Sequence, residues 1–200
     1  ILASLIGNLI IRLIKKGEPH NILNAGILSA SGIMIIFSYL ATKYLVNQSL
    51  PLFFAILIGL VAGLIIGFIT EFYTSAKCKP TKELSKASET GAATNIISGL
   101  ALGMQSTIVP VLVIAAAILG AYKLGGLFGI AMAAVGMLST LGITLATDCY
   151  GPVADNAAGI AEMAKMGQQV RERAEELDAV GNTTAAIGKG LAIGSAALTA

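Results

Sequence analysis

The sequence has 200 residues, of which 56% are hydrophobic and 12% are charged, whereas about a quarter of the residues of an average soluble domain are charged. The formal net charge of +2 at pH 7 is small and the basic residues are spread along the chain, which excludes a nucleic-acid-binding surface. A mean hydropathy of +0.82 instead predicts a protein of the lipid bilayer.

Six apolar stretches follow one another along the chain. A hydrocarbon core about 30 Å thick needs about 20 apolar helical residues, and four stretches are long enough to cross it: residues 22–46, 50–73, 93–122 and 126–150. Residues 1–14 and 183–200 are predicted to be parts of two further spans. The sequence therefore predicts an all-α, polytopic transmembrane helix bundle in one domain. Because the chain opens and closes inside apolar runs, it is expected to be an internal fragment of a larger protein.

Basic residues cluster at alternate boundaries between these stretches. In chain order the five boundaries carry three, one, four, one and three lysines or arginines. Since cytoplasmic loops are enriched in lysine and arginine, residues 15–21, 74–90 and 156–181 are predicted to be cytoplasmic loops. The basic residues are Arg12, Lys15, Lys16, Lys43, Lys77, Lys79, Lys82, Lys86, Lys123, Lys165, Arg171 and Arg173.

Four other residues stand out singly. Cys78 and Cys149 fall on the predicted cytoplasmic side, which is reducing, so free thiols are expected. Glu71 sits one turn inside the end of its span, and both an interfacial carboxylate and a site residue fit that position. His20, in a polar turn, is predicted to be a solvated loop residue.

The segment 148–156 carries the first candidate site. Asp148 and Asp155 are seven residues apart, so they share one helix face and lie ~10 Å apart along its axis if a single helix continues through Pro152. A row of carboxylates suits hard cations such as Mg²⁺, which take oxygen ligands. A pair of acids at a wet helix end explains the spacing equally well.

The segment 178–190 carries the second candidate site. At intervals of four, three and four residues, one face of a predicted helix presents Asp178, Asn182, Ala185 and Lys189. A lysine two turns into an apolar span needs an anionic partner or ligand. This favours a binding site over the alternative, an intrahelical network with a snorkelling Lys189.

Four segments resemble, in order and spacing, the signatures of the membrane-bound, ion-pumping pyrophosphatases. They are EFYTS at 71–75, TGAATNIISGLALGM at 90–104, DCYGPVADN at 148–156 and GNTTAAIGKG at 181–190. The last two are highly specific. The resemblance covers the whole chain, but the family's chains are several times longer.

The resemblance implies hydrolysis of cytoplasmic diphosphate to two phosphates, coupled to pumping of H⁺ or Na⁺ across the membrane by a homodimer of all-helical subunits. Asp155 matches a family ligand of the Mg²⁺–diphosphate complex and Asn182 another residue of that site, so both are expected to bind Mg²⁺ or its substrate. Asp148 and Lys189 match charged residues of the same region. The aspartates that hold the attacking water match positions mostly outside this chain, so no catalytic residue is assigned within it.

Ala185 and Gly188 carry a resemblance to the K⁺-dependent branch of the family. In the K⁺-independent branch a lysine occupies the position of Ala185, and its ammonium takes the place of a bound K⁺. The resemblance therefore implies stimulation by K⁺. The expected location is multi-pass in a bacterial plasma membrane, with an acidic eukaryotic compartment as the alternative, since the family occurs in both.

Two other interpretations rest on the residues alone. A segment of a secondary transporter or channel without hydrolytic activity also has glycine-rich helices with embedded Asp, Asn and Lys, although its charged site would be expected near the bilayer midplane. A non-catalytic packing module would use its polar residues only to join helices, and would tolerate Asp155→Ala.

Overall fold

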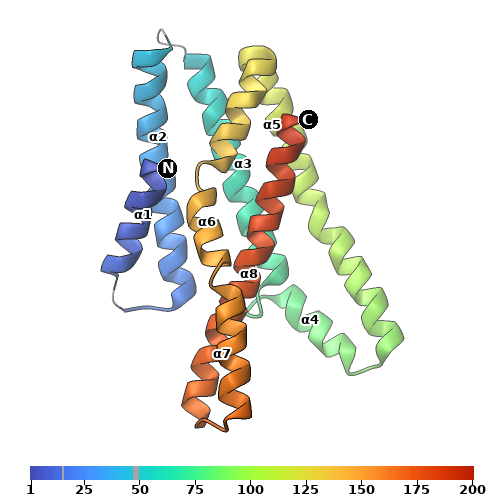
Figure 1. The fold of residues 1–200 in the computed structure, drawn as a ribbon. Coiled ribbons are helices and arrows are strands. Elements are labelled where there is room, and N and C mark those ends of the chain that lie inside the picture. Colours follow the sequence, from blue (N-terminus) through green and yellow to red (C-terminus); the bar gives the residue numbers. More distant parts are fainter. Residues whose placement is uncertain (15, 47–49) are drawn as a thin grey trace.

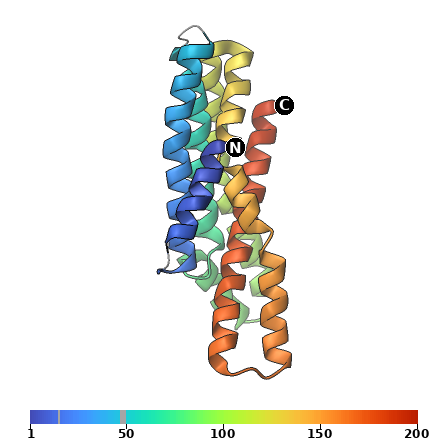
Figure 2. The ribbon, with the colours of Figure 1, turned by 60° about the vertical axis from the view of Figure 1, so that its left-hand side comes forward.

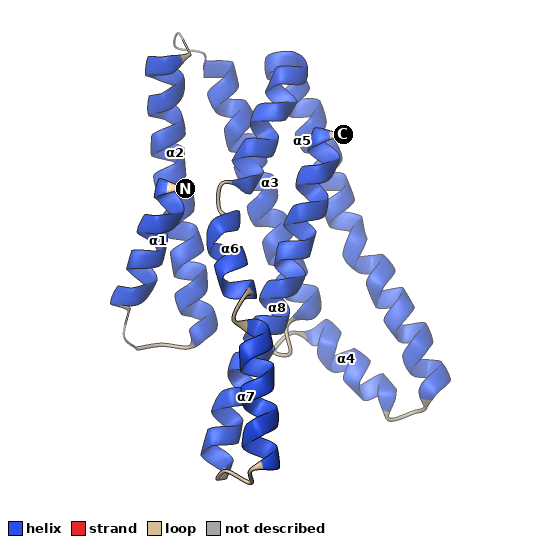
Figure 3. Cartoon of the chain, viewed as in Figure 1, coloured by secondary structure: helices blue, strands red, loops and turns tan. Residues whose placement is uncertain are grey.

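The computed structural model describes residues 1–14, 16–46 and 50–200. Within these ranges every regular element is an α-helix (Figure 3), so the all-α prediction is confirmed. The helices are α1 (Leu2–Leu13), α2 (Pro19–Leu45), α3 (Leu50–Thr74), α4 (Lys79–Ser88), α5 (Ala92–Leu138), α6 (Leu141–Asp148), α7 (Gly151–Met163) and α8 (Gln168–Thr199). Lys15, which was assigned to the first predicted loop, lies outside the described residues, as do residues 47–49.

Three helical stretches are long and apolar enough to cross a membrane: Pro19–Leu45, Leu50–Ser88 and Ala92–Leu138. Much of their apolar surface is not covered by this chain, since Leu100 is 66% exposed and Met104 is 75% exposed. Such a surface suits lipid or further helices rather than water. The structure thus has the helices that the predicted membrane bundle requires, whereas the number of crossings and their orientation stay predictions.

The helices α2 and α3, the second half of α5 and the second half of α8 run side by side, whereas the first half of α5 slants away from them toward α4 (Figure 1). A hairpin formed by α7 and the first half of α8 projects beyond the other helices (Figure 2). The start of α2 and the helix α4 lie at the same end of the bundle as this hairpin (Figure 1). The described parts of the three segments that are predicted to be cytoplasmic therefore lie at one end.

A sharp reversal divides α5 into two halves. Gly125 and Gly126 are its non-helical residues, and Gly126 has a φ of +60°, a conformation that favours glycine. Residues 121 and 129 would be ~12 Å apart in a straight helix, yet a Cβ on Gly129 would lie 2.3 Å from the carbonyl oxygen of Ala121. The two halves therefore pack directly on one another, with Lys123 beside the turn.

The tightest packing in the structure joins α3 to the second half of α5. A Cβ on Gly59 would lie 1.7 Å from the carbonyl oxygen of Ala133, and one on Gly136 would lie 2.1 Å from that of Ile56. Glycine allows the two backbones to touch, as in other small-residue contacts between membrane helices. Met137, which is fully buried, and Leu60 fill the space beside this contact.

Candidate functional site

The two aspartates of segment 148–156 lie on different helices. Asp148 is the last residue of α6, and α7 begins at Gly151 with Pro152 in its first turn, where the missing N–H of proline costs no hydrogen bond. Since the chain breaks at Cys149 and Tyr150, the single continuous helix that would align Asp148 with Asp155 does not form. Asp155 is exposed on the first turns of α7, whereas Asp148 is half-buried.

The face predicted for segment 178–190 does form, because α8 is helical without interruption from Gln168 to Thr199. The Nδ2 atom of Asn182 donates a hydrogen bond to Oδ1 of Asp178, over 3.2 Å. This bond directs the amide N–H₂ toward Asp178 and leaves the amide oxygen of Asn182 free to accept or coordinate. Lys189, seven residues further along the helix, is exposed.

A glycine contact brings α7 against α8. A Cβ on Gly181 would lie 2.7 Å from Cα of Gly151, so the two backbones are in direct contact. Beside it, the hydroxyl of Tyr150 donates to the carbonyl oxygen of Leu177, over 3.1 Å. The break between α6 and α7 at Tyr150 is thus attached to α8 at a fixed level.

The glycine contact also sets the register of the acidic residues. Asp155 follows Gly151 by four residues and Asp178 precedes Gly181 by three. Because the two helices are the arms of a hairpin (Figure 2), both carboxylates lie about one turn from the contact, on its hairpin side. The carboxylate oxygens of Asp155 on α7 and of Asp178 on α8 therefore lie at the same height along the hairpin.

The tip of the hairpin is joined by charge pairs. The guanidinium of Arg171 lies 2.7 Å from Oε1 of Glu175 and 3.3 Å from Oε1 of Glu162 on α7. The hydrogen bond that Arg171 donates to Glu175, with the added charge of Glu162, raises the pKa of Arg171. All three side chains are exposed, so these pairs orient the arms but add little stability.

The two small residues of the K⁺-dependent pattern lie where α8 meets α6. Ala185 is half-buried and Gly188 is buried, and a Cβ on Gly188 would lie 4.0 Å from Cγ2 of Thr144. A long side chain at position 185 would extend from the region where α8 meets α6, on the same helix face as Asn182 and Lys189.

His20 and Glu71, which the sequence does not connect, form a contact between α2 and α3. Nε2 of His20 lies 2.5 Å from Oε1 of Glu71, and the side chains are 22% and 21% exposed. Asn24 adds a second contact, since its Nδ2 lies 3.5 Å from Oε2 of Glu71. The prediction that His20 is a solvated loop residue was wrong.

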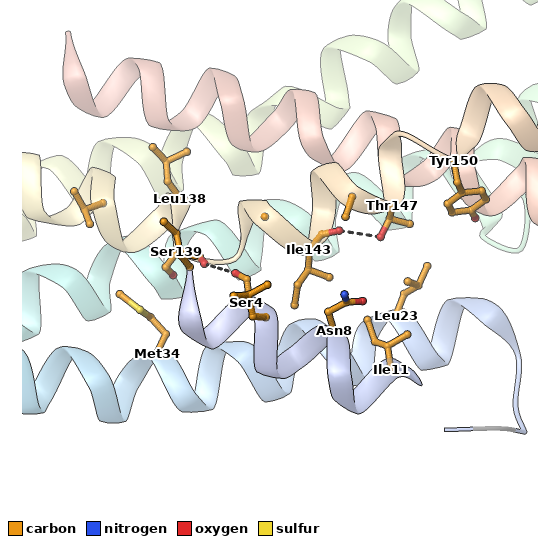
Figure 4. Close-up of a pocket in the computed structure, with 15 residues that line it drawn as sticks. Ser4, Asn8, Ile11, Leu23, Met34, Leu138, Ser139, Ile143, Thr147 and Tyr150 are labelled. Atoms are coloured by element: carbon orange, nitrogen blue, oxygen red, sulfur yellow. Dashed lines mark hydrogen bonds between the residues drawn. The ribbon is translucent and has the colours of Figure 1, made fainter. Parts of the chain in front are cut away.

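The largest cavity described, about 670 Å³, lies away from the residues of the candidate site. It is mostly apolar and is bounded by α1, α2, the end of α5 and α6 (Figure 4). Within it Ser4 donates to the carbonyl oxygen of Ser139, over 3.1 Å. Asp148, Asp155, Asn182 and Lys189 do not line it, so the candidate site is the open surface of the α7–α8 hairpin.

A family model described as inorganic H⁺ pyrophosphatase matches residues 1–200, the entire chain. The chain belongs to this family. The resemblance found in the sequence is thereby confirmed at the level of the pyrophosphatase family, and its signature segments 148–156 and 181–190 are the ones that form the α6–α7 break and the α8 face.

Curated relatives of this chain are ion pumps by name. A Clostridium tetani protein, whose name describes a K⁺-stimulated pyrophosphate-energized sodium pump, is 51% identical over the whole chain. A Methanosarcina mazei protein, named as a K⁺-insensitive pyrophosphate-energized proton pump, is 46% identical over the whole chain. A Bacteroides thetaiotaomicron protein with the K⁺-stimulated sodium pump name is 54% identical over 72% of the chain. The chain spans 31% of the length of the first two relatives and 21% of the third.

Proposed function

We propose that the protein containing this chain hydrolyses cytoplasmic diphosphate to two phosphates and couples this reaction to pumping of H⁺ or Na⁺ across the membrane. The observation that carries the proposal is the match of all 200 residues to the inorganic H⁺ pyrophosphatase family. Relatives named as pyrophosphate-energized pumps of both ions support the activity without selecting the ion. The chain's three long apolar helices are consistent with a multi-pass membrane protein.

The donor set of the α7–α8 hairpin fits a partial Mg²⁺ site. Asp155 offers an exposed carboxylate, and Asn182 offers the amide oxygen that its bond to Asp178 leaves free. This suits Mg²⁺, which is usually held by one or two carboxylates together with substrate phosphates and water.

In this mechanism the chain's residues bind and orient the substrate. Asp155 and Asn182 would hold Mg²⁺, which neutralises charge on the diphosphate oxygens when it is bound. Asp178 keeps the amide of Asn182 in one orientation. The ammonium of Lys189, ~10 Å further along the same helix face, attracts phosphate charge, and Asp148 adds a carboxylate where α6 ends. The groups that hold the attacking water are expected elsewhere in the full-length protein.

The proposal includes stimulation of hydrolysis by K⁺. Small residues occupy positions 185 and 188. Two relatives with K⁺-stimulated names are 51% identical over the whole chain and 54% identical over 72% of it, against 42–47% for three with K⁺-insensitive names. Replacement Ala185→Lys is expected to remove the K⁺ response while hydrolysis continues, because the new ammonium supplies the charge that K⁺ brings. Hydrolysis by the full-length variant, measured with and without K⁺, checks this, and an unchanged K⁺ response contradicts it.

The assembly and the membrane belong to the same proposal. The pump is expected to be a homodimer. Relatives from Clostridium tetani and Methanosarcina mazei support the plasma membrane of a prokaryote as its location. Chemical cross-linking of the full-length protein in its native membrane tests the dimer.

The deciding experiment is diphosphate hydrolysis by membranes that carry the full-length protein, with Mg²⁺ present or chelated, followed by ion uptake into sealed vesicles. Hydrolysis that requires Mg²⁺ and drives uptake of H⁺ or Na⁺ is the expected result. A well-folded protein without diphosphate hydrolysis would overturn the proposal and favour the secondary-transporter interpretation.

The Gly151–Gly181 contact gives a further prediction. In Gly181→Ala the new Cβ meets the α7 backbone, so the hairpin arms must separate and Asp155 shifts relative to Asn182. We expect hydrolysis to fall about tenfold or more, since misplacement by about 1 Å can cost 10²-fold. The matched control is Gly159→Ala, also on α7, because a Cβ there meets no atom within 4 Å. Equal activities of the two variants would contradict the prediction.

A further inference from the structure

A small cavity of about 30 Å³ lies between α2, α3, α6 and α8. It is lined mainly by apolar side chains and by Gly63 and Gly67, but Asn24 and Glu71 face it from one side and Thr140 and Thr144 from another. This volume accommodates a water molecule or an ion of similar size. The cavity shares no lining residue with the large apolar cavity, whose α6 residues Ile143 and Thr147 point the other way (Figure 4).

The two threonines behave differently from other buried threonines of this chain. Thr42, Thr147 and Thr184 each donate their hydroxyl to the carbonyl oxygen one turn earlier. Thr140 and Thr144 are 4% and 1% exposed, yet among the described residues neither hydroxyl has a hydrogen-bond partner. Every fully buried side-chain oxygen in the described part of the chain has a hydrogen-bond partner. The two threonine hydroxyls, which have none, therefore border open space. The cavity is the space that both residues line.

Glu71 supplies a charge at the same cavity. Its carboxylate lies close to the end of an apolar helix and is 21% exposed. His20 and Asn24 contact its two oxygens from the α2 side, and each carboxylate oxygen has a further lone pair with which it can coordinate a cation. The neighbouring acid, Glu18, is already paired with Lys77 over 2.7 Å.

The donor set selects the class of ion. One carboxylate with two hydroxyl oxygens provides a single negative charge and hard, neutral oxygen ligands, whereas Mg²⁺ usually keeps several of its waters, for which a cavity of about 30 Å³ has no room. We infer that the cavity binds a monovalent cation, Na⁺ or K⁺, through Glu71, Thr140 and Thr144, at a site separate from Asp155 and Asn182.

Equilibrium binding to the purified full-length protein without diphosphate tests this site, with radioactive Na⁺ in one arm and radioactive Rb⁺, a K⁺ analogue, in the other. Thr144→Val removes one hydroxyl at nearly constant shape and is expected to weaken one binding site per subunit about tenfold. Glu71→Gln is expected to abolish it. The matched control is Thr147→Val on the same helix, whose hydroxyl is bonded to Ile143, and it should bind like the wild type.

The outcomes separate this site from the proposed pump. Wild-type cation binding by Thr144→Val, or equal losses in Thr144→Val and Thr147→Val, would show that the hydroxyl of Thr144 is not a cation ligand and would overturn the inference. Thr144→Val decides the matter even if Glu71→Gln does not fold. Because the assay contains no diphosphate, its result does not depend on whether the protein hydrolyses diphosphate.

Discussion

Asp155→Asn is expected to lower diphosphate hydrolysis by the full-length protein about 10²–10³-fold. The substitution keeps the size of the side chain but removes its negative charge and half of its acceptor capacity. The lost stabilisation of a charged transition state is then ~3–4 kcal/mol. Steady-state hydrolysis at increasing Mg²⁺ measures the effect, and we expect that saturating Mg²⁺ does not restore the rate.

Glu162→Gln is the charge-matched control for this measurement. Glu162 is an exposed carboxylate on the same helix as Asp155, near the hairpin tip, and its partner Arg171 retains Glu175. Its loss is expected to change hydrolysis by less than about twofold, as for other surface ion pairs. Equal rates for Asp155→Asn and Glu162→Gln would remove Asp155 from the site.

Gly59→Ala is expected to have the largest effect on stability. The added Cβ would lie 1.7 Å from the carbonyl oxygen of Ala133, a backbone atom that no side-chain rotation can displace. The helices α3 and α5 must therefore separate, which opens the packing around Met137 and Leu60. We expect a loss of more than ~3 kcal/mol, above the usual range for overpacking. The thermal midpoint of the purified full-length protein measures it.

Gly32→Ala provides the comparison, since a Cβ at that position of α2 meets no atom within 4 Å. Alanine is better than glycine inside a helix by about 1 kcal/mol, so this variant should be as stable as the wild type or slightly more stable. A midpoint for Gly59→Ala equal to that of Gly32→Ala would mean that α3 and α5 do not touch in the membrane.

The periodic features of the sequence predicted the structure best. The apolar stretches became helices. Gly59, Gly63 and Gly67, which recur every four residues, share a face of α3 that packs on α5 and α8, since Gly63 approaches Met137 and Gly67 approaches Ile187. Such patterns work because one helix face must be buried wherever helices pack.

Features that depend on chain breaks or distant contacts were not predictable in this way. The single helix predicted over residues 126–150 is instead divided between α5 and α6, which are separated by Ser139 and Thr140, because the hydropathy there continues unbroken. Pro152 marked the break between Asp148 and Asp155, but its position did not say whether the helix bends or stops. The His20–Glu71 contact joins residues 51 positions apart, and no local pattern records such a pair.

The uninterrupted course of α8 has a mechanical consequence. Asn182 and Leu198 lie on one continuous helix, ~24 Å apart along its axis, so the helix would carry an axial displacement of Asn182 to Leu198. The neighbouring segment is divided, since α6 ends at Asp148 and α7 begins at Gly151. If a ligand drew Asp155 and Asn182 together, we expect α8 to move as one body while α7 turns relative to α6 at the break between them.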